Sequence, residues 1–233
     1  MRIFKYLENK HKASLINSGS LSIGTIEYYR KDEGKKRGDP TEGKYSFYIH
    51  QENEPVILTS EEANSLSYDY KIKKGTELEI KPKTWVKADL IVPNVYVFCA
   101  STIQGKHLNE KFGEAVYEIL DIKTFGNLIH YELSKIQPMI AWISGPVRYV
   151  ETKLYRITNE NKTEVLPCYS TKYGVNKIQL DDYFVKTSSP KDVTHSYKSE
   201  YEYRFVFIPK DKPVFPDGKI INIQKIKDVI DIK

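Results

Sequence analysis

One stretch near the end of the printed sequence constrains the fold more than any other. Aromatic and other side chains alternate there with a period of two. The aromatic set is Tyr201, Tyr203, Phe205 and Phe207, and the set between them is Glu200, Glu202, Arg204 and Val206. Aromatic and β-branched residues suit a pleated, half-buried surface. The alternation therefore predicts a β-strand with one aromatic face and one charged face.

The charged face of this strand is the first candidate functional site. Residues i and i+2 of a strand project from the same side, roughly 7 Å apart, so we expect Glu200 and Glu202 to lie together beside Arg204. Such a cluster is costly to desolvate unless it is hydrated, paired or in use, and a site that stabilises a developing cation needs carboxylates. The alternative is an exposed strand on which Arg204 only offsets the charge of Glu202.

Length and composition predict one soluble domain. The chain has 233 residues and a formal net charge of +5, and we expect a single domain over residues 1–233. It contains no apolar run of membrane-spanning length and no signal-peptide pattern at its start, so we expect a cytoplasmic protein that makes no membrane contact. The mild positive charge permits a phosphate-bearing partner without requiring one. Cys99 lies in an apolar run and is expected to be buried.

The remaining periodicities predict an α+β fold with mainly antiparallel sheets and a few helices, because strands outnumber helices and do not alternate with them regularly. The predicted strands cover residues 2–7, 21–29, 45–49, 91–101, 115–120 and 140–155, the last interrupted at 144–146. The predicted helices cover residues 9–18 with Gly19 as C-cap, 60–66, and 121–136 with Asp121 as N-cap. Residues 221–232 are expected to form a closing helix or a strand followed by a helix.

A charged, glycine-rich segment over residues 30–43 is broken by Pro40 and predicts a loop. Loops of this kind often carry function, although many are solvated connectors. Asp39 either forms an Asx-turn before Pro40 or lies with Glu42 along the same cleft as Glu202.

Several separated stretches together resemble a widespread bacterial family of unknown function, in which an Asn-Asp-Pro-Phe-Glu-like loop and a closing Tyr-x-x-Glu-x-Glu-x-Arg strand recur. The stretches that carry the resemblance are Phe4-Lys-Tyr6, Asn17-Ser-Gly19, Gly38-Asp-Pro-Thr-Glu-Gly43, Val97-Phe-Cys-Ala-Ser101, Phe184-Val-Lys186 and Tyr197-Lys-Ser-Glu-Tyr-Glu-Tyr-Arg204. Their layout is similar to ADP-ribosyltransferase-like folds, including toxins of bacterial toxin–antitoxin and phage-defence systems.

The resemblance implies an enzyme that uses NAD as a substrate and needs no metal. Cleavage of the nicotinamide–ribose bond passes through an oxocarbenium-like cation, which a nearby carboxylate stabilises. Glu202 would be that catalytic carboxylate, and Glu200 would help to orient the acceptor.

The resemblance also implies a nucleotide pocket. Lys5 and Tyr6 would border it, and Ser101 and Thr102 would support it. Arg204 or Lys5 would meet the pyrophosphate, and Tyr28 or Tyr29 would stack on nicotinamide. The alternatives are tyrosines that pack in the core and a lysine at a solvated strand position.

Two functions follow. The first is an NAD-dependent ADP-ribosyltransferase that modifies a nucleic acid or protein in bacterial toxin activity or phage defence, with an antitoxin or other regulatory partner possible. The second is a non-catalytic nucleic-acid-binding or interaction module on the same fold, which would use basic residues at 35–37 and surface tyrosines. A nuclease ranks last, because no histidine spacing supports a metal site or a triad.

Overall fold

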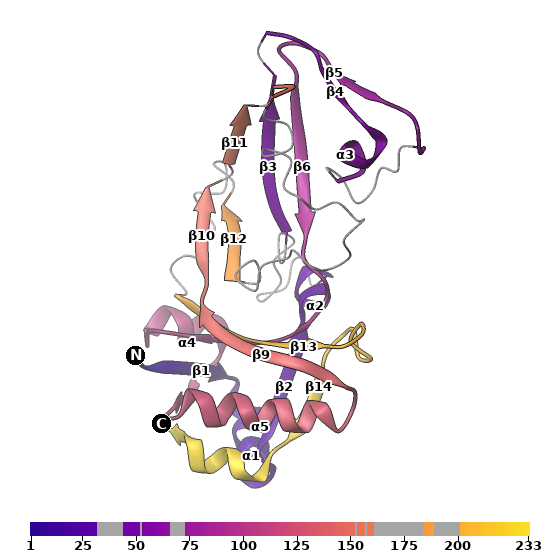
Figure 1. Ribbon diagram of the computed structural model, residues 1–233. Coiled ribbons are helices and arrows are strands. Elements are labelled where there is room, and N and C mark those ends of the chain that lie inside the picture. Colours follow the sequence, from indigo (N-terminus) through magenta and orange to yellow (C-terminus); the bar gives the residue numbers. More distant parts are fainter. Residues whose placement is uncertain are drawn as a thin grey trace. The chain divides into compact units, whose positions relative to one another are not determined.

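The computed structural model describes residues 1–31, 44–51, 53–65, 73–151, 153–156, 158–160, 184–188 and 201–233. Its contacts group the chain into two compact units (Figure 1). Unit 1 comprises Met1–Glu42, Pro93–Arg148 and Thr194–Lys233, and unit 2 comprises Gly43–Val92 and Tyr149–Val193. The fold is α+β with mainly antiparallel pairing, as predicted. A single domain over the whole chain stays a prediction.

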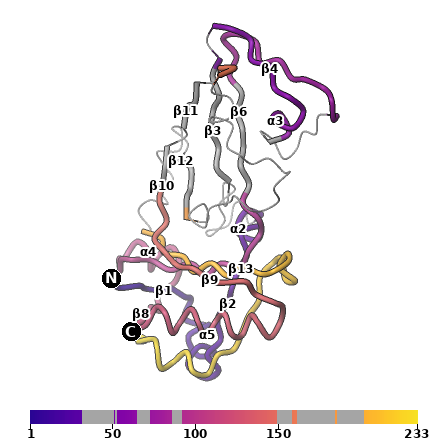
Figure 2. The backbone as a smooth tube through the Cα atoms, in the orientation of Figure 1, coloured from indigo at the N-terminus to yellow at the C-terminus, as the bar shows by residue number. Residues whose placement is uncertain are grey.

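Unit 1 is built on a sheet of eight strands among the described residues. They are β1 (Ile3–Leu7), β2 (Ser20–Thr25), β7 (Tyr96–Ser101), β8 (Ala115–Ile119), β9 (Met139–Pro146), β13 (Glu202–Pro209), β14 (Lys219–Asn222) and β15 (Ile230–Ile232). One path runs β14-β2-β7-β1-β8-β15, and β13 lies between β7 and β9. Strands from both ends of the sequence lie side by side, as β2 and β14 do (Figure 1). β1 and β15 likewise both pair with β8, and the tube of Figure 2 marks the two chain ends, N and C, close together.

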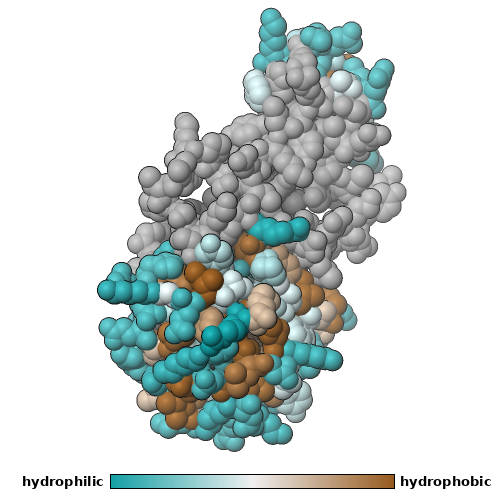
Figure 3. Space-filling view, turned by 90° about the vertical axis from the view of Figure 1, so that its left-hand side faces the viewer, coloured by the Kyte–Doolittle hydropathy of each residue, from teal (hydrophilic) through white to brown (hydrophobic). Residues whose placement is uncertain are grey.

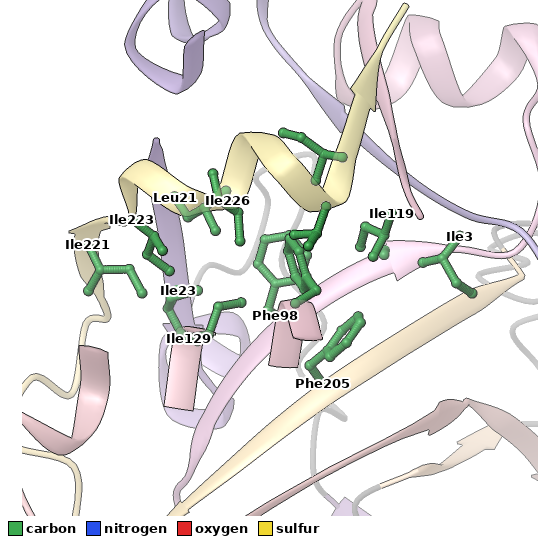
Figure 4. Close-up of a cluster of buried hydrophobic side chains, with 14 of the residues drawn as sticks. Ile3, Leu21, Ile23, Phe98, Ile119, Ile129, Phe205, Ile221, Ile223 and Ile226 are labelled. Atoms are coloured by element: carbon green, nitrogen blue, oxygen red, sulfur yellow. The ribbon is translucent and has the colours of Figure 1, made fainter. Parts of the chain in front are cut away.

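One face of this sheet is covered by helices and holds the main core. α1 (Asn9–Ser18), α5 (Ile122–Ser134) and the 3-10 helix η4 (Gln224–Val229) contribute buried residues to this core. On the opposite face, α4 (Lys106–Phe112) packs Leu108 against Phe4 and Tyr6. Unit 1 also contains α2 (Ile26–Lys31). The rings of Phe98, Phe125 and Phe205 have centroids 5.2 to 6.0 Å apart, distances at which tilted aromatic pairs attract. Figure 4 shows Phe98 and Phe205 within the buried cluster that also contains Ile226 of η4.

The strand singled out by its alternation, β13, is buried on both faces. Its aromatic residues enter the core, whereas Glu202 and Arg204 are also buried on the other side. The predicted strand with one aromatic and one charged face is therefore confirmed, whereas the alternative of an exposed charged face is wrong. The reason is position, because β13 pairs with β7 along one edge and with β9 along the other.

The surface of unit 1 still exposes a few large apolar side chains, among them Leu120, Tyr131, Ile140 and Ile220. In Figure 3, hydrophobic residues lie among hydrophilic ones on the visible face of this unit. No helix in the described part of the chain has the length and apolar character needed to cross a membrane.

Unit 2 consists of short sheets. Its elements are β3 (Lys44–His50), β4 (Val56–Leu58), α3 (Ser60–Ser65), β5 (Leu78–Ile80), β6 (Trp85–Ile91), β10 (Arg148–Glu151), β11 (Lys153–Arg156) and β12 (Val185–Ser188). β3 pairs with β6 antiparallel and with β11 parallel, β4 pairs with β5, and β10 pairs with β12.

Several predicted boundaries are wrong at places where a local cap or turn intervenes. The strand expected over residues 21–29 ends at Thr25, because the Thr25 hydroxyl accepts the backbone N–H of Tyr28 and Asn94 accepts that of Glu27, which starts α2. The strand expected over 91–101 is broken between β6 and β7. The interruption expected at 144–146 is absent, since β9 continues to Pro146. α4 has no counterpart among the predictions.

Candidate functional site

Cross-strand pairing brings the predicted site residues of β13 and β7 onto one side of the unit 1 sheet. Glu202 stands opposite Ser101, and Arg204 stands opposite Cys99. Residues directly opposite one another in an antiparallel pair project from the same side. Since the aromatic residues of β13 project into the core, these four side chains lie on the other side. We call this side, which carries Glu202, Arg204, Ser101 and Cys99, the polar face.

An ion pair dominates the polar face. Nε of Arg204 donates to Oε1 of Glu202 at 2.6 Å, and the exposed fractions of the two side chains are 1% and 7%. Arg204 lies between Cys99 on β7 and Gly145 on β9. Each charge offsets much of the cost of removing the other from water.

The backbone of Tyr201, directly before β13, is held by the end of β7. The carbonyl of Tyr201 accepts hydrogen bonds from the backbone N–H of Thr102 at 2.9 Å and from its hydroxyl at 3.2 Å. The hydroxyl of Ser101 accepts the N–H of Ile103 at 3.2 Å. Thr102 thus anchors the residue before Glu202, and Ser101 shapes the loop after β7. That these two residues support a nucleotide pocket stays a prediction.

Tyr6 also belongs to the polar face. Phe4 stands opposite Ser101, and Tyr6 is two residues further along β1, so the two rings project from the same side. The Tyr6 hydroxyl donates to the carbonyl of Ile103 at 3.2 Å and accepts the N–H of Gly105 at 3.0 Å. Burial raises the pKa of this phenol, although the hydrogen bond from Gly105 opposes the rise. The ring therefore fixes the loop that follows Ser101.

The two candidate stacking tyrosines, Tyr28 and Tyr29, lie in the middle of α2. Gly24 stands opposite Val97, on the polar face, and a Cβ at Gly24 would come within 2.6 Å of the Tyr29 ring. Tyr29 therefore covers the polar face of β2. Tyr28 contacts it edge to face, with ring centroids 5.4 Å apart. Val97 precedes Ser101 by four residues, about 13 Å along a strand, so this pair lies beyond the immediate surroundings of Glu202.

Lys5 is the predicted site residue that the sheet separates from the others. It alternates with Phe4 and Tyr6 along β1, so its side chain leaves from the core side. Its Nζ donates to the carbonyl of Cys99 at 2.6 Å and lies 4.6 Å from the centroid of the Phe98 ring. Lys5 is partly buried, which also differs from the alternative of a solvated strand position.

Three candidate residues, Glu200, Asp39 and Glu42, fall outside the described residues, as do the basic residues at 35–37. Glu200 was expected beside Glu202 on the assumption of extended backbone. Tyr201 has a φ of 47°, so that alternation argument does not apply across it. Among the described residues, no group of His, Cys, Asp and Glu side chains is placed to hold a metal ion.

Two features of this site were missed from the sequence. Cys99, expected to be buried, is partly exposed and stands opposite Arg204. Tyr201 has a left-handed backbone conformation directly before Glu202. The position of Cys99 opposite Arg204 depends on strand register, and the conformation of Tyr201 depends on the hydrogen bonds of Thr102. The residues of β13 alone indicate neither feature.

Comparison of the chain with known protein families, with curated proteins and with solved structures finds no match.

Proposed function

We propose that this protein is an NAD-dependent ADP-ribosyltransferase-like enzyme with Glu202 as its catalytic carboxylate. The observation that carries the proposal is the buried Glu202–Arg204 pair, on a strand that is paired along both edges and places Glu202 opposite Ser101. A carboxylate held in a fixed orientation and shielded from water stabilises a developing cation much more strongly than a hydrated one.

The proposed reaction breaks the bond between ribose C1′ and the nicotinamide nitrogen, and both bonding electrons leave with nicotinamide. The carboxylate of Glu202 stabilises the cationic ribose and accepts a hydrogen bond from its 2′-hydroxyl. A nucleophile of the acceptor, in a nucleic acid or a protein, then bonds to C1′ and loses its proton to water. Glu200 keeps its expected role of orienting that acceptor.

Arg204 has a different role in this proposal from a direct pyrophosphate contact. Its guanidinium is engaged with Glu202 and is as deeply buried as any side chain in the core. It is therefore a positioning residue, which holds the carboxylate in one orientation and compensates its charge. Tyr6, Ser101 and Thr102 are positioning residues as well, because their hydrogen bonds fix the loop after β7 and the turn before β13.

The test is NAD binding, measured by calorimetry and thermal shift, followed by incubation with labelled NAD and a cell extract. Glu202→Gln is expected to abolish label transfer. Glu118→Gln is the matched control, because Glu118 is also an ion-paired carboxylate on a strand of unit 1, and it should leave transfer unchanged.

Folding of the variants is checked by circular dichroism. Glu202→Gln leaves Arg204 without its carboxylate, so Glu202→Gln/Arg204→Met supplies a second inactive protein with no buried charge at either position. Absence of NAD binding at millimolar concentration, together with absence of label, would reject the enzyme. Salt-dependent RNA binding that is lost in Lys36 or Arg37 variants would instead support the nucleic-acid-binding module.

A further inference from the structure

We infer that Tyr201 is a substrate-contacting residue that receives a planar heteroaromatic ring of a nucleotide beside Glu202. The choice of a nucleotide rests on the proposed function. The assignment of Tyr201 itself comes from its backbone conformation, its exposure and its position in the chain.

The backbone of Tyr201 adopts a conformation that its side chain disfavours. Its φ of 47° lies in the left-handed region, and Lys83 is the other non-glycine residue with positive φ in the described part of the chain. Glycine and asparagine adopt this conformation with little strain, whereas a residue with a large side chain is strained in it. The two hydrogen bonds from Thr102 to the Tyr201 carbonyl hold the residue there. These hydrogen bonds therefore require the left-handed backbone conformation of residue 201, but they do not require a tyrosine side chain.

The ring of Tyr201 contributes little to the packing of the described residues. It is 56% exposed, whereas the neighbouring aromatic Tyr203 is 4% exposed. Tyr203 contacts Phe205 and hydrogen-bonds Ser144, but no ring contact or side-chain hydrogen bond joins Tyr201 to another described residue. Strain of this kind is characteristic of functional sites, where it is retained because the residue serves a ligand.

The position of Tyr201 indicates what the ring contacts. Its Cα is one peptide unit, about 3.8 Å, from that of the proposed catalytic carboxylate. Exposed tyrosines stack on bases because every base offers a π-face, and the phenol adds a polar group. The heteroaromatic ring can come from NAD or from a base of a nucleic-acid acceptor, and both sources offer the same chemistry to Tyr201.

The experiment compares Tyr201→Asn with Tyr201→Phe. Asparagine tolerates the left-handed region and removes the ring, so we expect the melting temperature to rise by about 2–4 °C. Ligand affinity should fall by about tenfold, the lower part of the range for loss of one stacking contact. Tyr201→Phe keeps the ring and should retain at least half of the wild-type affinity.

Two matched controls separate the two effects. Lys83→Asn relieves positive φ at a site in unit 2 and should raise the melting temperature without changing ligand binding. Tyr131→Asn removes a tyrosine of similar exposure, 61%, from α5 and should leave ligand binding unchanged.

The readouts distinguish the source of the ring. A weaker dissociation constant for NAD in Tyr201→Asn assigns the ring to NAD. Unchanged NAD binding with a higher KM for an added RNA oligonucleotide assigns it to the acceptor. A lower melting temperature with unchanged NAD binding and unchanged transfer overturns the inference and makes Tyr201 structural. If wild-type protein binds no NAD and transfers no label, the proposed function fails first, and the nucleotide assignment fails with it.

Discussion

Arg204 donates through Nε to Oε1 of Glu202 at 2.6 Å, from a position two residues further along the same buried strand. Arg204→Met removes the guanidinium and leaves the carboxylate in a dry environment. We expect the free energy of unfolding to fall by about 3–5 kcal/mol, measured by denaturant titration. Glu202→Gln/Arg204→Met should be more stable than Arg204→Met alone, because it also removes the buried carboxylate charge that Arg204 compensates. Additive losses from the two substitutions would contradict a coupled pair.

Replacing Gly126 of α5 by alanine should destabilise the protein, although Gly126 lies inside a helix. A Cβ at this position would come within 2.4 Å of the Trp142 ring. Alanine normally improves a helix by about 1 kcal/mol over glycine, but overpacking costs about 1–3 kcal/mol, so Gly126→Ala should lower the melting temperature. In a Trp142→Leu background the same substitution should become neutral or stabilising. Ser134→Ala, at the end of α5, is the control and should have little effect.

Stability should depend on Glu118 at acid pH. Hydrogen bonds from Arg2 and then Lys233 lower the pKa of Glu118 to about 2, from an ordinary 4.5. A lowered pKa stabilises the fold above the pKa of the unfolded chain, and this contribution is lost as the pH falls through the folded value. The melting-temperature difference between wild type and Glu118→Gln should therefore shrink as the pH falls from about 4.5 to about 2. Glu110→Gln, at an exposed position of α4, is the control for the loss of one surface carboxylate.

Substitution of Gly19 by alanine should destabilise the protein more than the same substitution at Gly75, which has a similar backbone conformation. It has a φ of 65°, and a Cβ there would meet the carbonyl oxygen of Ile223 at 1.9 Å. Gly75 has a φ of 85° with no atom within 4 Å of its Cβ position. Gly75→Ala therefore measures backbone strain alone, about 1–2 kcal/mol, and Gly19→Ala should cost more. Equal losses in thermal melts would mean that the η4 segment moves aside freely.

Helices with local signals were predictable from the sequence. The helix expected over residues 9–18 is α1, and Gly19 has the left-handed conformation of a C-cap. The helix expected from residue 121 is α5, where the Asp121 side chain accepts the N–H of Thr124. Both ends depend on side chains within a few residues of the boundary, so the information is present in short stretches of sequence.

The site was only partly predictable, because its geometry depends on register between distant strands. That Glu202 and Arg204 share a side of β13 follows from spacing, and their pairing was the stated alternative to a functional cluster. Their burial requires β7 and β9 as neighbours, which the alternation of β13 does not reveal. The side of β1 from which Lys5 projects is likewise decided by its partners Cys99 and Tyr117 across the sheet.

Because β13 lies between β7 and β9, the sheet cannot form around it until β13 has been translated. Both neighbouring strands are translated more than fifty residues before Glu202. Their edges that face β13 therefore stay unpaired with it while the intervening chain is made. Pairing over such a separation raises the entropic cost of reaching the native sheet. A chain released before residue 202 lacks the carboxylate, its arginine and the strand that joins the two neighbours. The proposed catalytic group therefore appears together with the strand that joins β7 to β9, and a product truncated before β13 carries neither.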